Sequence, residues 1–220
     1  MTGSDSSTRR AHGRDATYIA LIEAAEMLFG QSGVDGVTTR EIQEAAGSAN
    51  KNVISYYFGS KEALVNAIYG HRMPTMEARR AELLEAVDRS GAGKDLTALL
   101  DAHYRPLLEQ TDVHGRHSYS RFLSALHSGW GHTRLNVRQD YQVTETLVRR
   151  MKALLPAAVA ERLEHRLRIV YMMIAAALRI IDENQAEHPP EAHQLFSEAV
   201  HMAAAALRAP LDPTTENSPR

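Results

Sequence analysis

Apolar residues recur every three or four positions along most of this 220-residue chain, which is the spacing of amphipathic α-helices. A first helix is predicted over residues 14–30, where Leu21, Ala25 and Leu28 fall on one stripe. No segment alternates polar and apolar residues over the length of a strand with enrichment in β-branched residues. The pattern therefore predicts an all-α protein.

Turn and capping residues mark the ends of the next helices. Gly33 ends the first helix, and Thr38 with Glu41 forms a capping box at the start of a short second helix. A third short helix is predicted to run through Val53, Ile54 and Phe58, and a long fourth one over 61–88. Later helices are predicted over 94–110, 114–128, 133–154, 156–184 and 189–208.

These elements divide the chain into four parts. Residues 1–12 are predicted to be a disordered arm and residues 210–220 a disordered tail, because both are polar and poor in apolar residues. Residues 13–60 form an N-terminal three-helix domain of the helix-turn-helix kind, and residues 61–209 form a larger C-terminal helical domain.

Composition excludes several classes of site and any membrane-spanning segment. The sequence has no cysteine, which excludes disulfides, thiolate metal sites and cysteine nucleophiles. The first twenty residues lack the apolar run of a signal peptide, and the most apolar stretch, Ile169 to Ile181, is too short to span a bilayer. We therefore expect a cytoplasmic protein without membrane contacts.

Charge does not by itself indicate nucleic-acid binding. The net charge is −2, and residues 1–61 hold six basic residues against seven acidic ones. A binding surface for DNA must therefore depend on where individual polar groups lie, and not on a basic domain.

The informative stretch is Thr38 to Leu64, in which two short helices flank a turn at Gly47, as in a helix-turn-helix. Short polar side chains near the start of its second helix suit base edges in the major groove, because amides pair with adenine and lysine reaches guanine. The candidates are Asn50, Lys51, Asn52 and Ser55.

Other side chains around the same helices suit phosphate oxygens, since hydroxyls at a helix N-terminus and cations bind phosphates. These candidates are Thr38, Thr39, Tyr56, Tyr57 and Lys61, and Arg40 on the second helix is a further residue predicted to contact DNA. For the two tyrosines, packing between helices is an equally good interpretation, and we expect Tyr57 to do both.

Residues 16–64 resemble the DNA-binding region of the tetracycline-repressor (TetR) family, through AAEMLF, TTREI, EAAG and SYYFGSKEAL in that order. The resemblance implies a three-helix DNA reader, a helical core and a homodimer on palindromic operators. It also implies that a ligand in the core weakens DNA binding by moving the fourth helix. This chain has nine residues between Gly47 and Tyr57, one more than the common family pattern, so the recognition helix starts at one of residues 48–51.

The helices predicted over 156–184 and 189–208 are apolar on more than one face, which predicts burial by a partner subunit. We expect them to form a two-fold, four-helix interface, and a two-fold dimer reads a palindrome. Arg179 lies in the apolar run and needs a partner, for which Asp182 and Glu183 are candidates.

Aromatic and imidazole side chains concentrate between residues 100 and 141 and suit a mostly apolar pocket for an unknown small-molecule effector. The candidates are His103, Tyr104, His117, Phe122, Trp130, Tyr141 and Met173, although each of them also fits a purely structural role. His114 and His117 lack a clear third ligand, so we predict no metal site and no cofactor.

Catalysis is the weakest interpretation. The segment Gly91 to Lys94 lacks the upstream glycine and the Ser/Thr of a phosphate loop, and no nucleophile elbow is present. We therefore predict no enzyme, and a ligand-responsive regulator of transcription, in the family's usual sense a repressor. A helical ligand-binding module without DNA activity is the remaining alternative.

Overall fold

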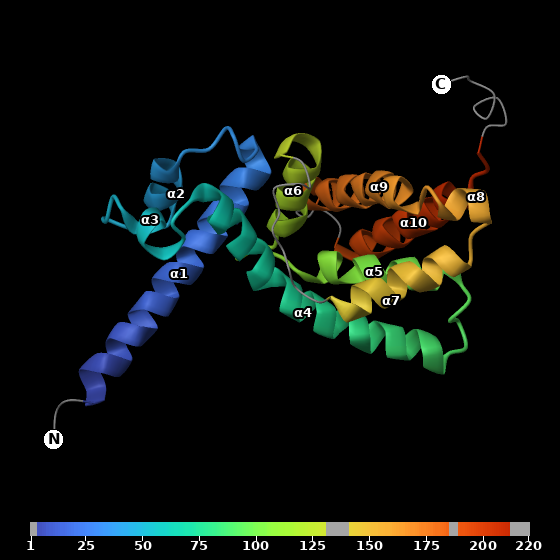
Figure 1. The fold of residues 1–220 in the computed structure, drawn as a ribbon, viewed down its shortest axis with the longest axis horizontal. Helices are drawn as coiled ribbons and strands as arrows, with labels where there is room; N and C mark the ends of the chain where they lie inside the picture. Colours follow the sequence, from blue (N-terminus) through green and yellow to red (C-terminus); the bar gives the residue numbers. More distant parts are fainter. Residues whose placement is uncertain (1–3, 131–140, 185–188, 212–220) are drawn as a thin grey trace. The chain divides into compact units, whose positions relative to one another are not determined.

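The computed structural model describes residues 4–130, 141–184 and 189–211, and the part of the chain that it describes is helical without any strand (Figure 1). The all-α prediction is therefore confirmed. The helices are α1 (Ser4–Ser32), α2 (Thr39–Ala45), α3 (Val53–Tyr57), α4 (Lys61–Arg89), α5 (Leu96–Glu109), α6 (Ser118–Ala125), α7 (Gln142–Ala153), α8 (Ala157–Ala160), α9 (Leu163–Asn184) and α10 (Pro189–Arg208). A π-helical turn, Leu126–Trp130, directly follows α6.

Several helices differ from their predicted bounds. Helix α1 begins at Ser4, so most of the segment predicted as a disordered arm is helical; the first proline of the chain is Pro74, and nothing before it forbids a helix. The segment predicted as one helix over 156–184 is two, α8 and α9. The beginning of the helix predicted over 133–154 and the end of the predicted tail lie outside the described residues.

Helix α6 begins four residues later than predicted because a turn takes up the preceding segment. The carboxylate of Asp112 accepts the backbone N–H of His114, and Gly115 adopts φ +74°. At its other end, Ser124, His127 and Ser128 bond backbone carbonyls four residues before them. Such bonds compete with the helical ladder, and here they accompany its change into a π-helix.

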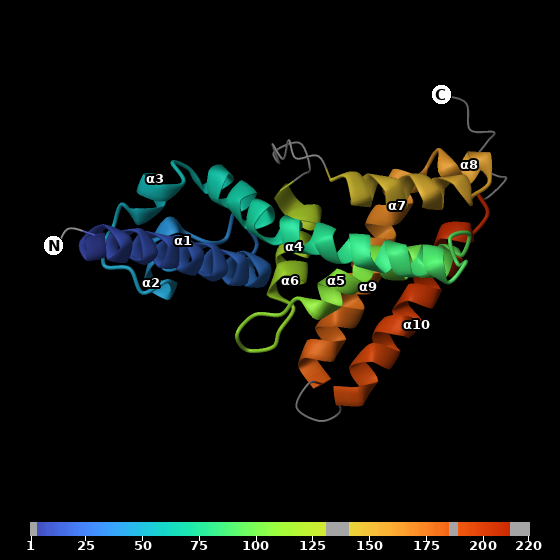
Figure 2. The ribbon, with the colours of Figure 1, turned by 90° about the horizontal axis from the view of Figure 1, so that it is seen from below.

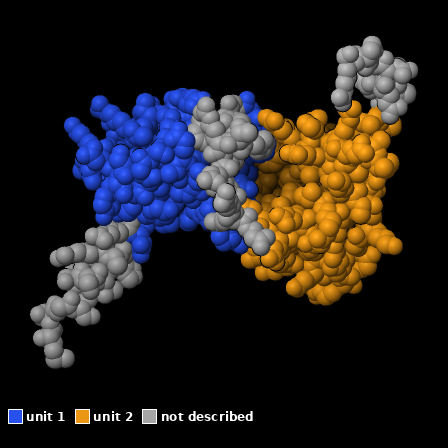
Figure 3. Space-filling view, viewed as in Figure 1, with its two compact units in different colours: residues 1–74, 112–114, 118–139 blue, residues 75–111, 115–117, 140–220 orange. Residues whose placement is uncertain are grey.

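The chain divides into two compact units (Figure 3). Unit 1 contains residues 1–74, 112–114 and 118–139, and unit 2 contains residues 75–111, 115–117 and 140–220. The sequence placed a domain boundary at residue 60, whereas here the first break in the chain follows Pro74, inside α4. Helix α4 therefore contributes residues to both units.

Unit 1 is built around α1, along which α6 and α2 pack. Its core includes Leu21, Ile22, Phe29, Ile42 and Phe122, all inaccessible to solvent. Helices α1 and α6 approach closely at Gly30, where an added Cβ would lie 3.0 Å from the backbone nitrogen of Phe122. A residue without a side chain permits this crossing.

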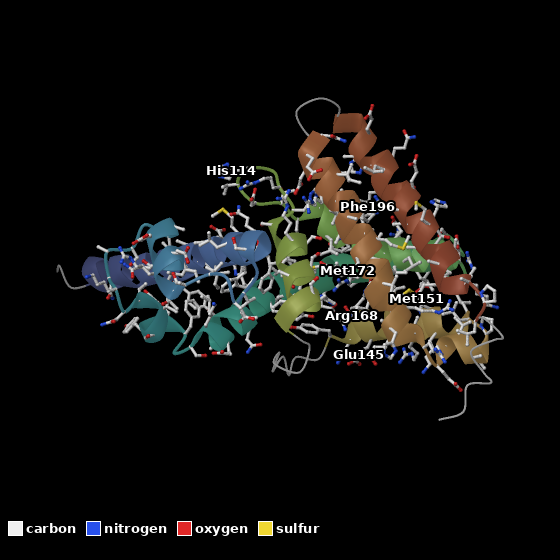
Figure 4. All side chains as sticks on the ribbon, turned by 90° about the horizontal axis from the view of Figure 1, so that it is seen from above. His114, Glu145, Met151, Arg168, Met172 and Phe196 are labelled. Carbon is white, nitrogen blue, oxygen red and sulfur yellow. The ribbon has the colours of Figure 1, made fainter. Side chains whose placement is uncertain are left out.

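Unit 2 contains α5 packed against α7 and α10, and α9 beside α10 (Figure 2). Figure 4 labels Met172 on α9 and Phe196 on α10, the second of which is buried. The guanidinium of Arg166 on α9 donates to the carbonyls of Ala206, Leu207 and Ala209, at 3.2, 2.9 and 2.6 Å. These bonds satisfy carbonyl groups at the end of α10, where no helical donor remains.

No helix within the described part of the chain is long and apolar enough to cross a membrane.

Candidate nucleic-acid interface

Helix α2 begins at the predicted capping box. The backbone N–H of Thr38 and its hydroxyl each donate to Oε2 of Glu41 at 2.7 Å, and the N–H of Glu41 returns a bond to Thr38 Oγ1 at 3.2 Å. The backbone N–H of Thr38 and then its hydroxyl lower the pKa of Glu41. The carboxylate thus stays ionised at the N-terminus of α2, where a negative charge is favourable.

A tight turn separates α2 from α3. Gly47 adopts φ +67°, which residues with a Cβ rarely do. The carboxamide of Gln43 donates to the carbonyl of Ser48 at 3.0 Å, and Oδ1 of Asn50 accepts the backbone N–H of Asn52 at 3.0 Å. The side-chain oxygen of Asn50 therefore shapes the turn, and its amide group remains to contact another molecule.

Helix α3 starts at Val53, later than any of the four positions that the sequence left open. The extra residue lies in the turn, so Lys51 and Asn52 precede the helix and do not belong to it. Val53 and Ile54 are buried, whereas Ser55 and Tyr56 are exposed.

The two tyrosines of α3 have different surroundings. Tyr56 is 64% exposed and lies edge-on to Tyr57 at 5.0 Å between ring centroids. Tyr57 is half-buried, with its ring 6.0 Å from that of Tyr18 on α1. The same Tyr18 stacks on Phe58 at 5.0 Å. Aromatic packing thus fixes α3 on α1, and Tyr56 is the tyrosine with the more accessible ring.

The cations of this region are partly engaged within unit 1. The Nζ of Lys61 donates to the carbonyl of Val37 and lies 5.6 Å from the ring centre of Phe29. Arg40 pairs with Glu44 at 2.8 Å on the exposed side of α2. Lys51 projects from the turn and is exposed. An ammonium has three donors, so Lys61 keeps donors for an external anion.

Most residues predicted to meet DNA lie on the surface of α2, the turn and α3. Thr38, Thr39, Arg40, Asn50, Lys51, Asn52, Ser55 and Tyr56 are exposed, and Tyr57 and Lys61 are half-buried. Hydroxyls, amides and a few cations are therefore brought together over about twenty residues of chain. These groups can donate to phosphates and read base edges.

Sequence reasoning missed a buried ion pair in the same unit. Glu26 of α1 is 1% exposed, and its carboxylate accepts from Nε and Nη2 of Arg72 on α4 at 2.7 and 2.9 Å. The hydroxyl of Ser118 donates to the same carboxylate at 2.5 Å. Burial opposes the charge of Arg72, but the hydrogen bond and charge of Glu26 outweigh it and raise the pKa of the guanidinium. The signal was present: Glu26 falls on the buried stripe between Ile22 and Phe29.

Five residues predicted for an effector pocket lie in unit 2. The rings of His103 and Tyr104 meet edge-on at 4.6 Å, and the Tyr104 hydroxyl lies 3.4 Å from the carbonyl of Leu167. The Nδ1 of His103 is buried without a hydrogen-bond partner. Burial, and then the charge of Arg80, lower the pKa of His103 well below its ordinary value, so its imidazole is neutral. Tyr141 and Met173 are half-buried.

The other pocket candidates have different environments. His117 is buried in a polar network with Asp182. Phe122 belongs to unit 1, where it is fully buried and stacks on Phe29 at 6.3 Å. Trp130 ends the π-helix of the same unit, and its side chain is outside the described residues.

His114 and His117 do not share a helical face, because both precede α6. Across the described residues, no group of three or more histidines, cysteines or carboxylates could hold a metal ion.

Comparisons with known proteins agree with the helix-turn-helix region. The sequence model of the family described as bacterial regulatory proteins, tetR family, matches residues 21–68. The HTH-type transcriptional repressor NicS of Pseudomonas putida is 32% identical over 96 residues, which make up 43% of this chain and 45% of that repressor. The chain thus matches less than half of the length of this curated relative.

A crystal structure of a proposed transcriptional regulator from Rhodococcus sp. RHA1 matches 87% of this chain and 94% of its own, at 20% identity and a TM-score of 0.32. The family match covers the C-terminal part of α1, then α2 and α3, and the start of α4, which are the elements that carry the polar surface described above. Over residues 21–68 the chain is therefore similar to the N-terminal region of bacterial regulatory proteins of the tetR family.

Proposed function

We propose that the protein is a ligand-responsive transcriptional repressor that binds a palindromic operator as a homodimer. The observation that carries the proposal is the family match over residues 21–68, which falls on the stretch where exposed amides, hydroxyls and Lys51 gather. The partial match to the repressor NicS favours repression over activation.

We propose separate roles for the residues of the interface. Lys51, Asn52 and Ser55 lie at the start of α3 and contact base edges in the major groove. Thr39, Tyr56 and Lys61 lie around them and contact phosphates. The hydroxyl of Thr38 and the oxygen of Asn50 are used within the fold, so they contribute chiefly by shaping the surface.

The homodimer forms through α9 and α10. Both helices carry large apolar side chains that are exposed in a single copy: Ile169 (62%), Met172 (39%) and Ile180 (44%) on α9, and Met202 (61%) on α10. Burying them against a second copy removes apolar surface from water. Arg179 lies on the same helix but is exposed and paired with Glu183 at 2.9 Å, so it is not the buried charge that the sequence suggested.

The effector binds in unit 2 and acts through α4. His103 and Tyr104 are the best-supported contacts, because the buried Nδ1 of a neutral imidazole accepts a hydrogen bond from a ligand. Helix α4 contributes residues 61–74 to unit 1 and residues 75–89 to unit 2. A shift of this helix on effector binding therefore changes the placement of α3 and releases the DNA.

DNA binding is tested by fluorescence anisotropy with duplexes tiled across the region upstream of the protein's own coding sequence. We expect one palindromic fragment to bind, with an affinity that falls steeply as salt rises. Lys61→Ala removes a proposed phosphate contact, lowers the affinity and reduces the slope of log K against log salt by about two per dimer. Asn52→Ala relaxes base preference, since one base contact contributes about 1–3 kcal/mol of discrimination.

The matched control is Lys152→Ala, which removes an exposed lysine on α7. If no fragment binds at low salt, or if both lysine variants behave alike, the proposed interface is wrong. In the first case the protein is a helical ligand-binding module without DNA activity.

The dimer is tested by sedimentation equilibrium. Ile169→Lys and Met202→Lys place charges on the exposed apolar faces of α9 and α10 and are expected to give monomers. The control is Val113→Lys, at an apolar residue that is 86% exposed but lies in the loop before α6. Dissociation by the control alone would contradict this interface.

A further inference from the structure

Two buried carboxylates are bound by consecutive residues of the chain. In unit 2, Asp182 of α9 accepts from His117, and in unit 1, Glu26 of α1 accepts from Ser118. Each carboxylate is 1% exposed. The peptide bond between His117 and Ser118 therefore joins two networks that belong to different units.

The network in unit 2 holds His117 by three groups. Its Nδ1 lies 2.6 Å from Oδ1 of Asp182, and its Nε2 lies 3.0 Å from the carbonyl of Leu108. Its backbone N–H lies 3.2 Å from both oxygens of the same carboxylate. Both ring nitrogens therefore lie within hydrogen-bond distance of an oxygen atom. His117 is thus tied to α5 and α9, and its position follows that of Asp182.

The network in unit 1 holds Ser118 by its hydroxyl. Ser118 is the first residue of α6, and it shares the carboxylate of Glu26 with the guanidinium of Arg72. Arg72 lies on α4, two residues before Pro74. A displacement of Ser118 removes one of three donors from a carboxylate that water does not reach, so Glu26 and Arg72 must move with it.

Chain geometry links the two networks tightly. Consecutive Cα atoms are about 3.8 Å apart, and the peptide unit between them is planar. Neither residue can turn away into solvent, since His117 and Ser118 are both buried. A change at Asp182 therefore reaches Arg72 through a short series of directed hydrogen bonds.

We propose that Asp182, His117, Ser118, Glu26 and Arg72 form a relay that couples helix α9 to helix α4. The state of α9, which we have assigned to the dimer interface, thereby sets how α4 is held on α1. The role of this relay in regulation rests on the proposed function. When α9 pairs with a second copy, the relay fixes α4, the helix that governs the DNA-binding surface.

The relay is tested without DNA, by nuclear magnetic resonance on the full-length protein labelled with ¹⁵N. The Nε–H of Arg72 is bonded to a buried carboxylate and reports on the unit 1 end of the relay. We expect Asp182→Asn to shift this resonance and to raise its exchange rate with water at least about fivefold. The Nε–H of Arg105, paired with Asp101 on α5, is the internal reference and stays unchanged.

Glu183→Gln is the matched control, because it removes the neighbouring carboxylate of α9, which pairs with Arg179 on the surface. It is expected to leave Arg72 unaffected. The reverse direction uses a milder change, Ser118→Ala, which should shift both ring nitrogens of His117 although the imidazole itself is unaltered. This second variant keeps the test valid if Asp182→Asn does not fold.

An unchanged Arg72 resonance in folded Asp182→Asn, or an unchanged His117 ring in Ser118→Ala, overturns the relay. A general loosening of the protein would also shift the Nε–H resonance of Arg105, and that result would count against the relay as well. Because both readouts are taken without DNA, the relay can hold even if operator binding fails. Where operator binding is found, Asp182→Asn should weaken it at least about tenfold and Glu183→Gln less than about twofold.

Discussion

The strongest test of the fold around the interface is removal of the cation that faces Glu26. In Arg72→Met the apolar part of the side chain is approximately retained, while the two N–H donors at 2.7 and 2.9 Å are lost. The carboxylate then remains 1% exposed and keeps Ser118 as a donor. An uncompensated charge is left inside unit 1.

The magnitude follows from burial. Breaking a buried ion pair by removing one partner costs about 3–5 kcal/mol, because the remaining charge is neither hydrated nor paired. The hydroxyl of Ser118 offsets part of this cost, so we expect Arg72→Met to lower the free energy of unfolding by about 3 kcal/mol. The double variant Glu26→Met/Arg72→Met removes both charges and should recover most of the loss, since apolar replacement of a whole buried pair is often neutral.

The assay is urea unfolding followed by far-UV circular dichroism, with the free energy obtained by linear extrapolation. The control is Arg79→Met, which breaks the more exposed pair with Glu109 and should cost about 0–1 kcal/mol. If Arg72→Met costs no more than Arg79→Met, or if the double variant is less stable than Arg72→Met, the reasoning about the buried carboxylate is refuted.

Three further predictions concern other positions. Gly30→Ala should destabilise the protein by about 1–3 kcal/mol in thermal unfolding, because the added Cβ meets the backbone of α6. This cost exceeds the gain from the better helix propensity of alanine, and a more stable variant would contradict the close crossing of α1 and α6. Burial, and then the charge of Arg80, lower the pKa of His103 in the folded protein below its value of 6.5 in the unfolded chain. As the pH falls below 6.5, the unfolded chain takes up a proton that the folded protein does not, so the free energy of unfolding decreases by up to about 1.4 kcal/mol per pH unit. Urea midpoints at pH 7.5 and 5.5 should therefore differ less in His103→Phe than in the wild type or in the surface control His201→Gln. Arg166→Met should speed amide exchange in the last turn of α10 without affecting α2, and equal exchange in both proteins would exclude the capping role.

The elements that the sequence predicts well are those specified by local signals. The capping box at Thr38 and Glu41 is formed as expected, since its two residues are three positions apart and need no tertiary context. Helix α10 begins at Pro189 and ends at Arg208, as predicted, because proline suits a first helical turn and the apolar period continues unbroken.

Features set by long-range contacts were not predictable in the same way. Asp182 was considered as a partner for Arg179 on its own helix, yet it pairs with His117, 65 residues away. Arg179 in turn is exposed and uses Glu183. The apolar run around Arg179 could not show which face of α9 meets its own unit, because that depends on the packing of α10 and α5.

The start of the recognition helix shows a third limit. An extra residue between Gly47 and Tyr57 can be absorbed by the turn or by the helix, and the sequence does not distinguish the two. In the structure Asn50 accepts the N–H of Asn52, which stabilises a non-helical turn and delays α3 until Val53.

The buried ion pair and the absence of a basic surface are connected. Residues 1–61 hold six basic residues against seven acidic ones, Arg40 is paired with Glu44, and Lys61 donates to Val37. Bulk attraction to DNA is therefore small, and affinity must come from hydrogen bonds that work only at the correct distance and angle. Such an interface depends on how firmly α1 and α4 hold α3 in place. We expect the buried pair between Glu26 and Arg72 to contribute to this rigidity, so a change in the pair should alter DNA binding without touching the residues proposed to contact DNA.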